Sequence, residues 1–184
     1  MSVAAGILYS IGHGSRAPED FLGLLERHRI DCLVDVRAYP ASRRHPQYAR
    51  LALEAALTAK GVRYVWEGTA LGGMRRPRAD SPHLALADAA FRGYADHMGT
   101  PEFAAGIGRL VALGARHRVA FMCAETMPVH CHRAFIADAL VACGVEVHHL
   151  VGPDDTRRHA LNPAARQGEG AMIYDGGRQL ALQL

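Results

Sequence analysis

Short apolar runs alternate along the chain with longer segments in which apolar residues recur at helical spacing. Five runs are rich in Ile, Leu, Val and aromatic residues, which favours β-strands. We predict strands at residues 7–11, 32–36, 62–66, 119–123 and 146–151. Apart from Asp35, the second run is apolar enough for burial on both faces. Such a run is typical of a strand inside a parallel sheet.

The segments between these runs predict helices. Pro18 fits the first turn of a helix that carries Phe21, Leu24 and Leu25 on one face. Further helices are predicted at residues 51–60, 85–98, 101–116 and 133–143. Gly61 and Gly144 follow two of them as C-terminal caps, and Thr100 precedes Pro101 as an N-terminal cap.

This alternation predicts a single-domain α/β fold. A mostly parallel sheet of about five strands would carry helices on both faces, in a Rossmann-like three-layer arrangement. We assign residues 1–151 to this domain and 152–184 to a C-terminal extension. Residues 172–174 and 179–182 flank Asp175-Gly176-Gly177, so the extension is either a short hairpin packed on the same domain or a loose tail.

Composition narrows the function classes. A length of 184 residues suits one domain, and a net charge of +3 is too weak to indicate nucleic-acid binding. The apolar stretches are too short to span a membrane, and the N-terminus does not resemble a signal peptide. Four cysteines are too few for a disulfide scaffold, so we expect a cytoplasmic protein with reduced thiols.

Polar residues gather where the predicted strands end. The carboxyl ends of parallel strands share one edge of a sheet, where ligands usually bind. Residues at or just after these ends include His13, Ser15, Asp35, Arg37, Glu67 and Cys123, followed by Glu125, His130, Cys131, His132 and Arg133. We expect one polar pocket at this edge, built around Cys123, Glu125 and Cys131-His132-Arg133.

Asp35 stands where burial is expected, and Arg37 lies on the same face of the strand. A buried carboxylate is costly unless it is paired. Two interpretations stay open. The pair is either a structural ion pair, or a device in which Asp35 orients Arg37 toward an anionic ligand.

The cysteines fall into two groups. Cys123 precedes a loop that leads into a helix, and the dipole at a helix start stabilises a thiolate. The alternative is a buried structural thiol, which is the more common role of a single cysteine. In Cys131-His132-Arg133, a thiol, an imidazole and a guanidinium in succession are a poor choice for packing alone. We predict that Cys32 and Cys143 are core residues.

These clusters resemble, in this order, the domain-of-unknown-function family numbered 488. The similarity extends over residues 7 to about 150 and rests on several motifs: Ser10-Ile11-Gly12-His13, Leu33-Val34-Asp35-Val36-Arg37 with Pro40, Ser42 and Arg43, Tyr94-Ala95-Asp96-His97-Met98, and Met122-Cys123-Ala124-Glu125 with Cys131-His132-Arg133. The resemblance implies a compact α/β fold with a cysteine-containing site, and it supplies no reaction. It adds Ser42 to the substrate-binding candidates His13, Ser15, Asp35, Arg37 and Arg133.

Three functions remain open. The favoured one is an enzyme whose catalytic residues are Cys123, Glu125, Cys131 and His132, acting as a cysteine nucleophile or redox thiol on a small anionic substrate without a cofactor. The second is a metal-dependent enzyme that holds zinc or iron with the same four residues. The third is a non-catalytic module for a nucleotide or nucleic acid. The weak charge and the absence of a glycine-rich phosphate loop count against it. We expect no membrane partner, and the oligomeric state is left open.

Overall fold

The predicted alternation builds a six-stranded sheet in the computed structural model, which describes residues 6–168 and 170–176. The sheet order is β3-β2-β4-β1-β5-β6. Five strands pair in parallel with one another: β1 (Ile7–Gly12), β2 (Cys32–Asp35), β3 (Arg63–Trp66), β4 (Val119–Cys123) and β5 (Glu146–Gly152). The predicted α/β class and mostly parallel sheet are therefore confirmed.

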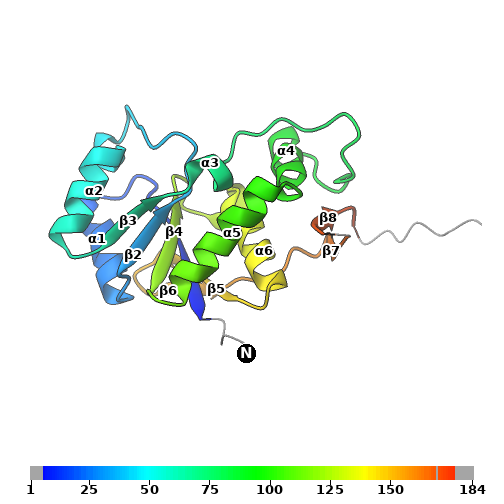
Figure 1. Ribbon diagram of the computed structural model, residues 1–184. Coiled ribbons are helices and arrows are strands. Elements are labelled where there is room, and N and C mark those ends of the chain that lie inside the picture. Colours follow the sequence, from blue (N-terminus) through cyan, green and yellow to red (C-terminus); the bar gives the residue numbers. More distant parts are fainter. Residues whose placement is uncertain (1–5, 169, 177–184) are drawn as a thin grey trace, which may run out of the picture.

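Helices cover both faces of this sheet (Figure 1). On one face lie α1 (Pro18–Arg27) and α2 (Arg50–Ala59), preceded by the short η1 turn (Pro46–Tyr48). The other face carries α3 (Gly68–Leu71), α4 (Ala89–Met98), α5 (Pro101–Gly114) and α6 (Arg133–Ala142), with the η2 turn (Pro128–His130) before α6. The two helical layers enclose two separate apolar clusters, one on each side of the sheet.

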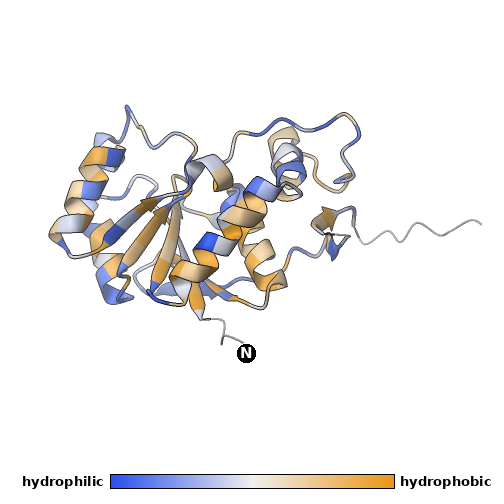
Figure 2. Ribbon diagram, viewed as in Figure 1, coloured by the Kyte–Doolittle hydropathy of each residue, from blue (hydrophilic) through white to orange (hydrophobic). Residues whose placement is uncertain are grey.

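The central strands β2 and β4 are apolar, except for Asp35 at the end of β2, because both of their faces are covered. Every residue of β2 and β4 is buried. Figure 2 shows this as hydrophobic colouring through the middle of the sheet, with hydrophilic positions on the outer sides of the helices. None of the helices in the described ranges combines the length and the apolar character that crossing a bilayer demands.

Local capping explains where the helices begin and end. The hydroxyl of Thr100 accepts a hydrogen bond from Phe103 N at 3.2 Å, as predicted for the start of α5. Gly61 and Gly144 follow α2 and α6 with φ of 70° and 80°, which confirms them as C-terminal stops. The predicted start of α4 at residue 85 is wrong. The carboxylate of Asp88 caps Ala90 N and Phe91 N, so that helix begins at Ala89.

The C-terminal part adds two features that the hydrophobic pattern did not predict. Strand β6 (Asp155–Arg158) pairs antiparallel with β5 at the edge of the sheet. Strand β8 (Met172–Tyr174) pairs with the preceding β7 (Ala165–Gln167). The partner expected for β8, residues 179–182, lies outside the described residues.

A buried polar chain ties this C-terminal part to α6. The hydroxyl of Tyr174 donates to Asp138 Oδ2 at 2.9 Å, and His159 Nε2 lies 2.9 Å from Asp138 Oδ1. His159 Nδ1 in turn lies 2.9 Å from the Nε2 of His149 on β5. Because Asp138 is almost fully buried, these partners supply the hydrogen bonds that its carboxylate needs.

Candidate functional site

A cavity of about 670 Å³ lies beyond the carboxyl ends of β1, β2 and β4. At this point of the sheet, β1 and β2 lead to helices on one face and β4 leads to α6 on the other. Such a divergence of connections opens a crevice for ligands. The predicted site residues that line the cavity are His13, Arg37, Ser42, Cys123, Glu125, Cys131 and His132.

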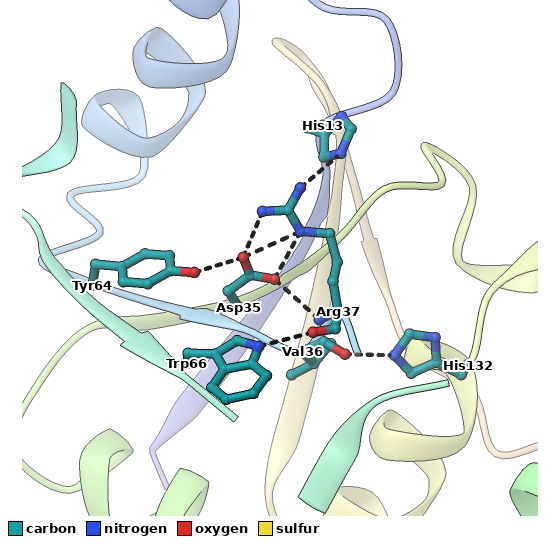
Figure 3. Close-up of polar contacts among 7 residues, drawn as sticks. All are labelled: His13, Asp35, Val36, Arg37, Tyr64, Trp66 and His132. Carbon is teal, nitrogen blue, oxygen red and sulfur yellow. Dashed lines mark hydrogen bonds and ion pairs between the residues drawn. The ribbon is translucent and has the colours of Figure 1, made fainter. Parts of the chain in front are cut away.

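Asp35 and Arg37 form a buried ion pair beside the cavity (Figure 3). Asp35 Oδ2 lies 2.6 Å from Arg37 Nη2, and its Oδ1 lies 2.9 Å from Arg37 Nε. The backbone N–H of Arg37 and the hydroxyl of Tyr64 also donate to this carboxylate, at 3.0 and 2.8 Å. With four hydrogen-bond donors, the charge of Asp35 is compensated, which explains how a fully buried carboxylate is tolerated.

His13 holds the other side of the Arg37 guanidinium. His13 Nδ1 donates to Gly14 O at 2.8 Å, so Nε2 is left to accept from Arg37 Nη1 at 3.4 Å. The imidazole also stacks on Tyr48 with ring centroids 4.2 Å apart. Burial lowers the pKa of His13 to about 4, so the ring is neutral near pH 7. A guanidinium has five N–H groups, which is more than the three that Arg37 uses for Asp35 and His13.

Three potentially reactive atoms meet at the opposite wall. The sulfurs of Cys123 and Cys131 lie 3.9 and 3.7 Å from His132 Nδ1, and all three atoms are within 4.8 Å of one another. Cys123 ends β4, whereas Cys131 and His132 stand directly before α6. The backbone N–H of Arg133 at the start of α6 donates to the Cys131 sulfur at 3.5 Å.

These contacts shift the pKa values of the two thiols in opposite directions. The hydrogen bond from Cys123 lowers the pKa of Cys131 well below the ordinary cysteine value, and His132 and Arg133 add to this effect although burial opposes it. The same hydrogen bond, together with burial, raises the pKa of Cys123. The first proton to leave this pair therefore leaves Cys131, and Cys123 stays a thiol beside the thiolate.

The tautomer of His132 follows from its outer contact. His132 Nε2 lies 3.1 Å from Val36 O, and a carbonyl oxygen only accepts, so Nε2 carries the hydrogen (Figure 3). In the neutral ring, Nδ1 then presents a lone pair to both sulfurs. His132 is therefore placed to take a proton from either thiol.

Arg133 does not line the cavity and instead packs behind the wall that Cys123, Cys131 and His132 form. Its side chain is 1% exposed and donates to Ser10 Oγ at 2.7 Å, to Thr126 O at 3.2 Å and to Glu125 O. These bonds fasten the loop after β4 onto β1. Arg133 thus stands behind the cavity wall, and the arginines that line the cavity are Arg37 and Arg44.

Two loops also pack too closely for larger residues. The backbone N–H groups of His13 and Gly14 donate to Cys123 O and Ala124 O at 3.1 and 2.7 Å. A Cβ on Gly12 would stand 1.8 Å from Glu125 O, and Gly14 has a left-handed φ of 55°. Glycine at both positions lets the loops after β1 and β4 lie against each other.

Other predicted residues are placed differently. Ser15 is exposed and does not belong to the cavity lining. Glu125 is exposed and lines the cavity, but it does not join the Cys123, Cys131 and His132 cluster. Cys32 is buried as predicted, whereas the prediction for Cys143 is wrong, because this residue caps the C-terminal end of α6 with its side chain exposed.

Several lining residues were not identified as site residues from the sequence. Tyr94 on α4 lies with its ring centroid 5.1 Å from that of His132, and its hydroxyl donates to Leu71 O at 2.8 Å. The backbone at Gly73 comes so close to His132 that an added Cβ would stand 3.0 Å from Nδ1. Phe91 and Met74 complete an apolar side of the cavity. Only the Tyr94 motif gave a signal, through the family resemblance.

Comparison with known proteins agrees with that resemblance. The family model described as "Domain of unknown function DUF488" matches residues 17–140, about two thirds of the chain. The chain belongs to this family. The DUF488 match includes β2, α4, β4 and the start of α6, and therefore contains most of the cavity wall, whereas His13 precedes it. No curated protein and no solved structure matches the chain significantly.

Proposed function

We propose that the protein is an enzyme that uses the Cys131 thiolate to attack a small anionic substrate held in the cavity. The observation that carries this proposal is the position of the Cys131 sulfur. It lies between the first N–H of α6, His132 and the Cys123 thiol, all of which favour the negative charge. A thiolate is the nucleophilic form of cysteine, and the helix dipole adds to its stabilisation.

The charges around the cavity support an anionic substrate. Two arginines, Arg37 and Arg44, line it, whereas Glu125 is the one carboxylate among the described lining residues. Arg37 is held rigidly by Asp35 and His13, so its remaining N–H groups are oriented in advance for a carboxylate or phosphate. Phe91, Tyr94 and Met74 provide an apolar surface for the uncharged part of the substrate.

Alkylation of the reduced protein with iodoacetamide, followed by peptide mass mapping, tests the nucleophile. Because its pKa is lowered, Cys131 should reach its maximal rate near pH 7, whereas an ordinary thiol with a pKa of about 8.5 still speeds up several-fold toward pH 9. His132→Asn removes a group that lowers this pKa, so the plateau should move to higher pH. His130→Asn, at the exposed neighbour on the same cavity wall, should leave the profile unchanged.

A metal-dependent enzyme is the second candidate, and a specific arrangement favours it. Cys123, Cys131 and His132 offer three ligand atoms within 4.8 Å of one another, next to an open cavity that would give a zinc or iron ion a free position. The hydrogen bond from His132 Nε2 to Val36 O is the outer contact that metal-bound histidines commonly make.

Elemental analysis decides between the two candidates. Stoichiometric zinc or iron that protects Cys123 and Cys131 from alkylation until a chelator is added would make the metal enzyme the better proposal. Slow alkylation of Cys131 at every pH, with no metal bound, would contradict both candidates and leave two structural thiols.

A further inference from the structure

The two cysteines of the site have different surroundings although they share one histidine. The sulfur of Cys131 accepts the N–H of Arg133 at 3.5 Å at the start of α6, whereas Cys123 is the last residue of β4. Their sulfurs lie within 4.8 Å of each other, and both residues line the cavity. A nucleophilic thiolate can be oxidised to a sulfenic acid, and a second thiol within reach can convert that sulfenic acid into a disulfide.

We propose that Cys123 and Cys131 are a redox pair that reduces a peroxide-class substrate, with Cys131 as the attacking sulfur and Cys123 as the resolving sulfur. This inference rests on the proposed function, because it requires Cys131 to be the nucleophile. It adds the class of reaction and a second role for Cys123, as the sulfur that closes the disulfide.

The first step transfers oxygen to sulfur. The Cys131 thiolate attacks the terminal oxygen of a hydroperoxide, an S–O bond forms and the O–O bond breaks. The leaving oxygen departs as an alkoxide or hydroxide and takes a proton from water. Cys131 is now a sulfenic acid; its sulfur has lost two electrons and the peroxide has gained them. The N–H groups of Arg37 face the same cavity and can stabilise the departing anion.

The second step closes a disulfide. His132 Nδ1, 3.9 Å from the Cys123 sulfur, takes the thiol proton, and the Cys123 thiolate attacks Cys131. The S–S bond forms as the S–O bond breaks, and the leaving hydroxide takes the proton from His132 and departs as water. A cellular dithiol then reduces the disulfide by thiol–disulfide exchange and restores both cysteines.

The remaining cysteines lie too far away to take the resolving role. Cys143 follows the C-terminal end of α6, whereas Cys131 precedes its N-terminal end, and a helix of ten residues is about 15 Å long. Cys32 pairs with Val119 at the opposite end of β4 from Cys123, about 13 Å along the strand. The fold therefore selects one cysteine pair out of four cysteines.

The experiment treats the reduced full-length protein with one equivalent of hydrogen peroxide, blocks free thiols after unfolding, and maps the peptides by mass. We expect one linked peptide pair joining Cys123 to Cys131, reversible by dithiothreitol, with Cys32 and Cys143 still free. Cys123→Ser should stop the reaction at a Cys131 sulfenic acid that a dimedone reagent traps. Cys131→Ser should leave Cys123 unoxidised, and Cys143→Ser should behave as the wild-type protein.

The failures of the two proposals can be told apart. If Cys131 alkylates as a thiolate near pH 7 but peroxide leaves it unoxidised, or takes it to the sulfinic acid without a Cys123–Cys131 link, the redox pair is wrong and the proposed nucleophile stands. If Cys131 reacts with neither reagent, both proposals fail. The Cys123–Cys131 link is measured in the wild-type protein, so the absence of this link contradicts the redox pair even if a serine variant folds poorly.

Discussion

At the scale of single residues, the buried ion pair of Asp35 and Arg37 fixes one side of the cavity. The sequence placed an acid inside an apolar strand and an arginine two residues later, which left a structural and a ligand-orienting interpretation open. The structure shows the ion pair, and the ligand-orienting interpretation stays a prediction. Arg37 uses one edge of its guanidinium to neutralise Asp35, and it presents the rest of that group to the cavity.

Replacement of Asp35 by Asn should destabilise the protein strongly, because it leaves a buried guanidinium without its counter-charge. We expect a loss of about 3–5 kcal/mol in the free energy of unfolding, as for other broken buried ion pairs. Tyr64→Phe removes a single hydrogen bond to the same carboxylate and should cost about 1–2 kcal/mol. Urea unfolding of the two variants measures both values. Equal losses would mean that the ion pair adds nothing beyond one hydrogen bond.

At the scale of elements, the site depends on how closely the loops after β1 and β4 approach each other. These loops continue the pairing of the two strands beyond the sheet, and Arg133 fastens them from α6. The sequence predicted the two strands and α6, but it gave no register. It therefore could not reveal that Gly12 lies against the loop that follows Cys123.

Gly12→Ala should disturb this contact, because its Cβ would overlap the backbone carbonyl of Glu125. We expect a loss of more than about 2 kcal/mol in stability, since backbone has to shift, and slower alkylation of Cys131. Gly23→Ala is the matched control. Gly23 is exposed inside α1 with no atom within 4 Å of an added Cβ, so alanine should stabilise the protein by up to about 1 kcal/mol. A neutral effect of Gly12→Ala would show that the loops are not tightly packed in solution.

At the scale of the whole molecule, the C-terminal part supports the helix that carries the site. Tyr174 is fully buried, packs with its ring centroid 5.1 Å from that of Phe135 and donates to Asp138, and both partners belong to α6. His159 holds the same carboxylate from beyond β6. The residues after 152 therefore contribute to the packing of α6, whose N-terminus holds Cys131.

Tyr174→Ala should leave a cavity beside Phe135 and remove one partner of Asp138, with a loss of about 3–5 kcal/mol in stability. Tyr39→Ala, at a tyrosine that is 73% exposed, should change stability by less than about 0.5 kcal/mol. Chemical denaturation followed by circular dichroism compares the two. If Tyr174→Ala were as mild as Tyr39→Ala, the C-terminal segment would not support α6.

The sequence alone determined the fold class, the five parallel strands, most helix boundaries and the edge of the sheet at which the polar residues gather. These features follow from short-range patterns, since apolar periodicity, helix caps and strand ends can each be recognised within a window of about ten residues. The short β6 strand lacked any such pattern, because three of its four residues are exposed and it is bound to the sheet mainly through its backbone.

Only the tertiary structure decided which polar residues face the cavity and which support it. Arg133 and Arg37 both lie near strand ends or helix starts in the sequence, yet Arg133 is hydrogen-bonded behind a loop and Arg37 lines the cavity. That difference depends on strand order and on side-chain direction, which bring together residues far apart in the chain, such as His132 and Val36, which are 96 positions apart. Contacts of such separation leave no local periodicity, so their geometry exists only once the chain has folded.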